Sequence, residues 1–250
     1  MKCILKLRAL IFLISQLLNH LTFGQLKISK KNNLISLHTD RYFDYICFEN
    51  FYFKRKMMNT SEFILDKVAP IFNKQGYIGT SLTDITNATG LTKGAIYCNF
   101  TNKEDLALQS FRFNVDLAIT PLFKLVAAKS GSLDKLYAIT NYQRSYYDLV
   151  KDRGGCPMLR VGVDTKFINP LLFQTAQNLS QKFITGLTNI ISEGIAKEEI
   201  LPTTDPLKYA KIILSLIEGS SLLAFTHNDE SYIITAMDFI DSIIIDKIRK

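Results

Sequence analysis

Helix start and stop signals are the feature of this sequence that most constrains its fold. They recur from Asn59 to the C-terminus, where Ser, Thr, Asn or Asp precede segments whose apolar residues return every three to four positions. No stretch of this part alternates apolar and polar residues as a half-buried strand does, and no internal repeat is visible. The sequence therefore predicts an all-α fold.

The first expected helix lies in "SEFILDKVAPIFNKQG". Thr60 or Ser61, with Glu62, is predicted to cap its start, and Gly76 is predicted to end it. Its apolar residues fall on one face, as expected for a helix that covers a core: Phe63, Ile64, Val68, Ile71 and Phe72.

Two short helices are expected next, joined by a glycine turn. Ser81 and Asp84 form a variant of the capping box, and Gly90 closes that helix. Thr92 is predicted to cap the following helix, which runs from Lys93 to about residue 99. Such a pair is typical of a helix-turn-helix, although many helical hairpins share the pattern.

The second of these short helices has an unusual composition. Gly94 in its first turn costs about 1 kcal/mol relative to Ala, which is reasonable if this helix must approach another molecule closely. Thr92, Lys93, Tyr97 and Lys103 carry hydrogen-bonding groups suited to phosphate oxygens. These residues point to a nucleic-acid contact.

Longer helices are expected in the rest of the chain. Thr101 or Asn102 opens one, Asn169 and Pro170 open another that reaches about residue 197, and Asp205 with Pro206 opens one that reaches about residue 225. A last helix is predicted over residues 231–248. The final two are apolar on more than one face, so we expect them to bury surface against a second copy of the chain.

The net charge of +7 does not by itself indicate nucleic-acid binding. Residues 1–56 hold ten Lys or Arg and three Asp or Glu, and residues 57–250 hold twenty of each, so the excess belongs to the first 56 residues. Residues 57–105 hold four Lys and five acidic residues. Any DNA binding there must depend on individually placed groups rather than on a strong positive field.

Residues 1–56 leave three interpretations open. Their basic start and apolar run of about ten residues resemble a secretory signal peptide, but the residues near a cleavage point are not small. The segment ends at Met57 and Met58, directly before the first clean helix start, which favours a start codon assigned too early. A genuine extension of unknown role is the third interpretation.

Residues 62–106 resemble the DNA-binding domain of the tetracycline-repressor (TetR) family of bacterial regulators. The motifs that match are "FNKQGYIGTS", the "DI" of the second helix, "GLTKGAIY" and "FTNKEDL", at the mutual spacing of the family. The resemblance implies a three-helix DNA-binding domain followed by a helical effector-binding and dimerisation domain. Phe100 would pack inside, whereas Cys98 and Asn99 depart from the bulkier residues common in the family. The residues that would face DNA are Thr80, Ser81, Thr92, Lys93, Gly94, Ala95, Tyr97, Cys98 and Lys103.

A ligand pocket is expected among the middle helices, where aromatic or soft side chains gather. Cys156 lies in the Gly-rich loop "RGGCPML", where a lowered thiol pKa would suit a redox or electrophile sensor and a small buried residue is the alternative. At helical spacing each candidate also fits a plain core position. The pocket candidates are Phe111, Tyr137, Tyr142, Tyr146, Cys156, Met158 and Phe173, with Phe123, Phe167 and Phe183 as further members.

These observations predict a cytoplasmic homodimeric repressor that a small-molecule effector releases from a palindromic DNA operator. The expected domains are residues 1–56 (extension or signal-like segment), 57–105 (helix-turn-helix) and 106–250 (effector binding and dimerisation). The alternative is an exported helical protein that binds a lipid or small ligand. No catalytic, metal-ligand or cofactor motif is visible, since the four cysteines and three histidines are scattered, so we expect neither an enzyme nor a cofactor.

Overall fold

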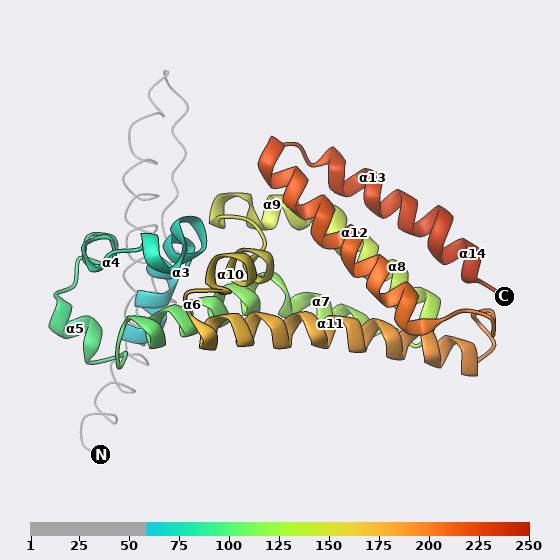
Figure 1. Ribbon diagram of the computed structural model, residues 1–250, viewed down its shortest axis with the longest axis horizontal. Coiled ribbons are helices and arrows are strands. Elements are labelled where there is room, and N and C mark those ends of the chain that lie inside the picture. Colours follow the sequence, from blue (N-terminus) through green and yellow to red (C-terminus); the bar gives the residue numbers. More distant parts are fainter. Residues whose placement is uncertain (1–58) are drawn as a thin grey trace, which may run out of the picture. The chain divides into compact units, whose positions relative to one another are not determined.

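The computed structural model describes residues 59–250 of the chain. This part is helical throughout and contains no strand, apart from one isolated bridge between Ile200 and Arg249 (Figure 1). The all-α prediction is therefore confirmed for the described residues. The interpretations of residues 1–56 lie outside them.

The helices follow one another with short connections. The first four are α3 (Thr60–Gly79), α4 (Leu82–Thr89), α5 (Lys93–Tyr97) and α6 (Lys103–Ala118). They are followed by α7 (Thr120–Ala127), α8 (Ser132–Arg144), α9 (Tyr146–Val150), a 3-10 turn (Lys151–Arg153), α10 (Pro157–Thr165), α11 (Pro170–Ala196) and α12 (Pro206–His227). The chain ends with α13 (Ser231–Phe239), a π-helical segment (Ile240–Ile245) and α14 (Asp246–Ile248).

The first helix begins one residue earlier than the sequence suggested. Asn59, rather than Thr60 or Ser61, is its N-cap, because the side chain of Asn59 accepts a hydrogen bond from the backbone N–H of Ser61 at 3.3 Å. At the other end Gly76 does interrupt the helix, with φ +79°, but one more turn follows and carries α3 to Gly79. The glycine therefore makes a kink instead of an end.

The other predicted helix starts are confirmed. Ser81, Thr92, Asn102, Asn169 and Asp205 each accept a backbone N–H bond from the first turn of the helix that follows. Helix α5 is shorter than expected and ends at Tyr97. The expected long helices α11 and α12 agree with the sequence to within about two residues at each end.

Two apolar cores divide the described part of the chain. The first joins α3, α4, α5 and α6 and is built on fully buried side chains, among them Ile64, Ile85, Ile96, Phe100 and Leu106. Phe100 is 2 % exposed, which confirms its predicted inward position. The second core belongs to the helices from α7 onward. The short helices α4 and α5 thus share a core with α3 and α6, to which Leu172 of α11 also contributes.

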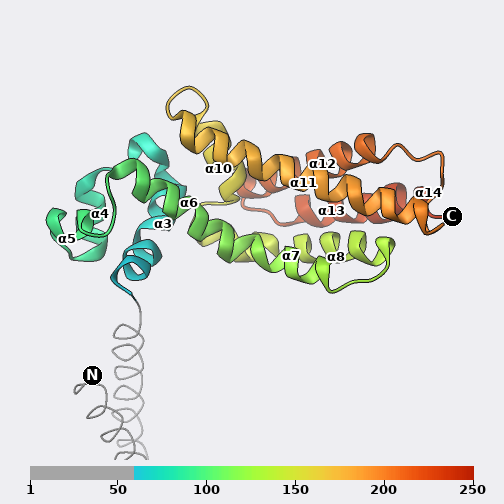
Figure 2. The same cartoon turned by 90° about the horizontal axis from the view of Figure 1, so that it is seen from below.

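The long C-terminal helices lie side by side. The α12 helix packs against α11 and α13, and α8 packs against α11, α13 and the π-helical segment (Figures 1 and 2). By length and composition alone α12 could span a membrane. One of its faces is buried among these neighbours, with Ala210, Ile213 and Ile217 at most 2 % exposed.

Candidate nucleic-acid interface

The first short helix, α4, is held at both ends by its own residues. The backbone N–H of Ser81 donates to Asp84 at 2.7 Å, and the N–H of Asp84 donates to the Ser81 hydroxyl at 3.1 Å. The hydrogen bonds from Ser81 hold the pKa of Asp84 below its ordinary value. Gly90 ends the helix in the left-handed conformation, with φ +68°. The turn that leads into α5 is therefore fixed.

The second short helix, α5, is tied to the start of α3. The Thr92 hydroxyl accepts from the N–H of Ala95 at 3.2 Å, which caps the helix. The Asn99 amide donates to the carbonyl of Ala95 at 2.9 Å, and its oxygen accepts from the Ser61 hydroxyl at 3.1 Å. Asn99, which departs from the family pattern in sequence, thus has a structural role in orienting α5.

The outer side of α5 presents most of the residues predicted to read DNA. Ile96 is fully buried beneath the helix. The residues around it are exposed or half-buried, and none of their side chains is needed by the core: Thr92, Lys93, Gly94, Ala95, Tyr97 and Cys98. Ser81 is exposed at the start of α4. The structure therefore brings these predicted residues to the surface of one small domain.

Gly94 has no structural reason to be a glycine. A Cβ built at this position would meet nothing closer than the Thr92 hydroxyl at 4.0 Å, and the backbone does not require a positive φ. Since a helical glycine costs stability, the absence of any need within the chain is consistent with close approach by another molecule.

Thr80 does not fit the predicted contact with DNA. Its side chain is fully buried, and its hydroxyl donates to the carbonyl of Gly76 at 2.8 Å. The backbone N–H of Thr80 donates to the same carbonyl at 3.2 Å. Thr80 therefore caps the end of α3, and of the adjacent pair only Ser81 is accessible.

Lys103, at the first position of α6, is held by an aromatic ring. Its ammonium lies 4.8 Å from the centre of the Tyr77 ring. Burial lowers the pKa of Lys103, and the charge of Asp84 acts in the opposite direction. Tyr77 thus positions this lysine, a role that the sequence did not suggest, and contact of Lys103 with DNA stays a prediction.

The sequence also gave no sign of the polar contacts between α3 and the loop and helix around α10. The Asn73 amide, 2 % exposed, donates to the carbonyls of Arg153 and Gly155, both at 2.9 Å. The N–H of Tyr77 donates to the Asp164 carboxylate at 2.8 Å. These bonds connect the small domain to the C-terminal helices. The loop also lies close to α3, since a Cβ on Gly154 would lie 2.9 Å from the backbone of Asn73.

The predicted pocket residues do not share one cavity. Phe111 lines a groove between α6 and α11, whereas Tyr137 and Tyr142 line a separate hollow beside α8. Tyr146, Cys156 and Met158 are buried in the second core, and Phe173 is half-buried. Of the further candidates, the rings of Phe123 and Phe183 contact each other at a tilt of 40°, with their centres 5.1 Å apart, and Phe167 is 90 % exposed. Helical spacing alone could not separate core positions from lining positions.

Cys156 does not have the lowered pKa that its loop suggested. Its thiol is buried and lies 3.6 Å from the carboxylate of Glu218 on α12. Burial, and then the Glu218 charge, raise the pKa of Cys156 to about 12. The position therefore fits a small buried residue, as the alternative interpretation held. Within residues 59–250 there is also no group of three or more possible metal ligands.

Comparison with known proteins matches both the N-terminal short helices and the C-terminal helices of this chain. The profile described as "Bacterial regulatory proteins, tetR family" matches residues 64–109, and "Tetracyclin repressor-like, C-terminal domain" matches residues 132–240. The HTH-type transcriptional repressor ComR of Escherichia coli is 30% identical over 173 residues, which cover 64% of this chain and 77% of ComR.

Solved structures agree along the same length. A TetR-family regulator from Chloroflexus aurantiacus is 30% identical with a TM-score of 0.71, and covers 78% of this chain and 98% of its own. A TetR-family regulator from Cytophaga hutchinsonii is 32% identical with a TM-score of 0.69, and the match covers 76% of this chain and 94% of that protein. With its own helix-turn-helix and C-terminal helices both matched, this chain belongs to the TetR family of transcriptional regulators.

Proposed function

We propose that this regulator is a homodimeric repressor that binds a palindromic operator through α4 and α5 and leaves it when a small effector binds. The observation that carries the proposal is the outer side of α5. Thr92, Lys93 and Tyr97 offer donors there, and Gly94 is open to close approach. A regulator of the same fold, CifR, 14% identical with a TM-score of 0.64, has been crystallised with 26-bp operator DNA.

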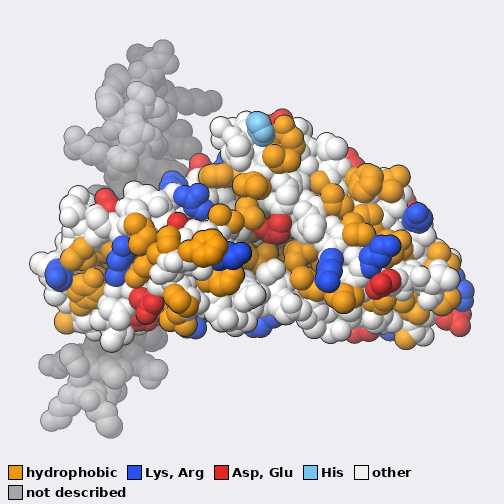
Figure 3. Space-filling model, viewed as in Figure 1, with side chains coloured by type: hydrophobic (Ala, Val, Ile, Leu, Met, Phe, Trp, Pro, Cys, Tyr) orange, Lys and Arg blue, Asp and Glu red, His pale blue; other side chains and the backbone are white. Residues whose placement is uncertain are grey.

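The surface of the last helices supports the dimer. On α12 and α13 large apolar side chains stay exposed after the core is complete, and apolar side chains appear over this part of the surface in Figure 3. They include Leu222 at 47 %, Leu223 at 43 % and Phe239 at 46 % exposed. Such exposed apolar residues favour burial against the same helices of a second copy, related by a two-fold axis. A two-fold dimer places two copies of α5 to read a palindrome.

Release by an effector requires contacts that connect the helices of the DNA-binding part to the C-terminal helices. The bonds from Asn73 to the 153–155 loop and from Tyr77 to Asp164 provide it, because a shift of α10 would pull on the end of α3. In this proposal the effector favours an arrangement in which the two copies of α5 no longer match the spacing of the half-sites.

The exported ligand-binding protein is not favoured, because the family matches cover both the DNA-binding and the C-terminal parts. We propose cytoplasmic action on DNA and no catalytic role.

The test is a gel mobility shift of the full chain with DNA from upstream of its own gene. Lys93→Gln is expected to weaken binding. It should also reduce the slope of log K against log salt concentration by about one, because one phosphate contact is lost. Lys129→Gln is the matched control, because Lys129 is an exposed cation after α7 and far along the chain from α5. Equal effects of the two substitutions would mean that α5 does not contact DNA.

A further inference from the structure

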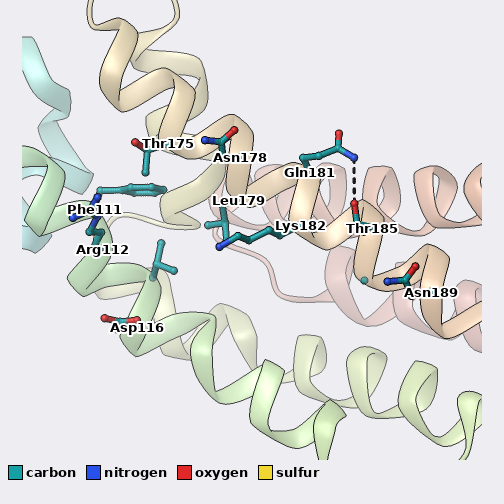
Figure 4. A pocket seen from close by; sticks show the side chains of 12 residues that line it. Phe111, Arg112, Asp116, Thr175, Asn178, Leu179, Gln181, Lys182, Thr185 and Asn189 are labelled. Carbon is teal, nitrogen blue, oxygen red and sulfur yellow. Dashed lines mark hydrogen bonds between the residues drawn. The ribbon is translucent and has the colours of Figure 1, made fainter.

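A groove between α6 and α11 is a feature of the described surface that the DNA-binding role does not use. Its volume is about 960 Å³, in the range of small-molecule pockets. All of its lining residues come from these two helices, which face each other across it in Figure 4.

The groove is lined by both apolar and polar side chains. Phe111 and Val115 of α6 and Leu179 of α11 supply the apolar part. Amides and hydroxyls of α11 surround them, among them Thr175 and Asn178. A ligand that fits must therefore have an apolar body and a polar group.

Two cations of the lining indicate that the polar group of the ligand is negatively charged. Arg112 on α6 and Lys182 on α11 both line the groove and are exposed. The charge of Arg112 also acts on Asp105, two turns earlier on α6, and lowers the pKa of that carboxyl. Lys182 points from α11 into the space between the helices (Figure 4). The lining contains one acid, Asp116, whose carboxylate already accepts from the Thr120 hydroxyl at 3.0 Å. The lining therefore has an excess of positive charge that an anion would satisfy.

The inner end of the groove adjoins the connection to the DNA-binding domain. Phe111, 4 % exposed, lines the groove and also lines a small void of about 20 Å³ among α3, α6 and α10. Asn73 and Asp164, which connect α3 to the C-terminal part, line the same void. An occupant that displaces the Phe111 ring would therefore disturb the contacts that hold α3.

We propose that this groove is the effector site and that the effector is an amphipathic small anion, with a carboxylate or similar group held by Arg112 and Lys182 and an apolar tail on Phe111, Val115 and Leu179. This inference rests on the proposed effector-released repressor, and it names the class of effector and its place.

The test is calorimetric titration of the full chain with decanoate, below its micelle concentration, and with decyltrimethylammonium, which has the same tail and the opposite charge. Decanoate is expected to bind saturably, and the cation at least about tenfold more weakly. Arg112→Gln and Lys182→Gln are each expected to weaken decanoate binding by about tenfold or more. Lys124→Gln, which removes an exposed cation of α7 outside the groove, is expected to leave it unchanged.

Gly186 allows the groove to be filled without damage to the fold. It lines the groove, and a Cβ built on it meets nothing within 4 Å. Gly186→Leu is expected to abolish decanoate binding and to keep or raise Tm, because Leu is the better helix former. A folded Gly186→Leu protein that binds decanoate normally, or a wild type that prefers the cation or binds neither, would overturn the proposal.

A mobility shift separates this proposal from the proposed function. Decanoate is expected to release operator DNA from the wild type but not from Gly186→Leu. Binding of decanoate without release would overturn the effector role of the groove while DNA binding stands. Failure of the wild type to bind DNA at all would instead refute the proposed function, and calorimetry would still decide whether the groove takes the anion.

Discussion

A substitution at one residue, Gly94, is expected to affect the stability of the fold and the affinity for DNA in opposite directions. Because a Cβ has room there, Gly94→Ala is expected to keep the fold and to raise the free energy of unfolding by up to about 1 kcal/mol. The added methyl group would stand where DNA approaches α5, so the operator affinity is expected to fall by about tenfold or more. Chemical denaturation and a mobility shift measure the two effects. Unchanged affinity would show that DNA does not approach this turn.

The two described cysteines are expected to react very differently. Cys98 is exposed on α5, whereas Cys156 is buried with a pKa raised to about 12, so only Cys98 holds an accessible thiol. Under native conditions N-ethylmaleimide should modify Cys98 quickly and Cys156 only after unfolding, as peptide-resolved mass spectrometry can measure. Operator DNA should slow the reaction at Cys98. Fast modification of Cys156 in the folded protein would restore the sensor hypothesis.

Glu218 is expected to make stability depend on pH. Burial raises its pKa from 4.5 to about 7, so the unfolded state loses this proton at a lower pH than the folded state does. The folded state is therefore favoured below pH 4.5, and that advantage is lost as pH rises to about 7, at a cost of up to about 3 kcal/mol. Glu218→Gln should remove this loss. The free energy of unfolding of the wild type and of Glu218→Gln is measured by denaturation at pH 5 and pH 8, at one protein concentration. The same change with pH in both proteins would refute the role of Glu218.

At the scale of helices, Asn73 is expected to couple α3 to the C-terminal part. Asn73→Ala removes two hydrogen bonds to the 153–155 loop, one of them buried, and should destabilise the fold by about 2 kcal/mol. If these bonds carry the effector signal, the variant should still bind operator but respond less to effector. Asn102→Ala is a matched control, since it removes the cap of α6 without touching this loop. An equal effector response in wild type and Asn73→Ala would exclude this route.

Local signals explain how much of the fold could be predicted. Each cap at Ser81, Thr92 and Asn102 depends on residues within three positions. Ser81 and Thr92 were predicted, and Asn102 was one of two candidates with Thr101. The distinctive spacing of the α4 and α5 motifs likewise identified the family. Contacts distant in sequence were missed, because nothing local to Asn73 or Tyr77 indicates a partner 80 or more residues away.

The candidate pocket shows the same limit more sharply. An aromatic residue on an apolar helix face has one sequence pattern whether it fills a core, as Tyr146 does, or lines a groove, as Phe111 does. Arg112 and Lys182 were missed because a cation on a helix is usually only solvated. Their significance appears when α6 and α11 are placed opposite each other.

At the scale of the whole molecule, the exposed apolar residues of α12 and α13 predict the oligomeric state. The double substitution Leu223→Glu and Phe239→Glu places charges on both helices, and is expected to give folded monomers in analytical ultracentrifugation. Affinity for a palindromic site should fall by about a hundredfold or more, because the two copies of α5 are no longer linked in one molecule. Val163→Glu, at a 76 % exposed position of α10, should leave the dimer intact. A dimer that persists in the double variant would place the interface elsewhere.

In the proposed dimer, two copies of α5 read one symmetric DNA site. Selection of bound fragments from a random DNA pool by the full chain, followed by sequencing, tests it most directly. The account predicts enrichment of one short sequence repeated in inverted orientation, with half-site centres about one helical turn or a multiple of it apart. Enrichment of a single unrepeated sequence, or of none, would contradict it.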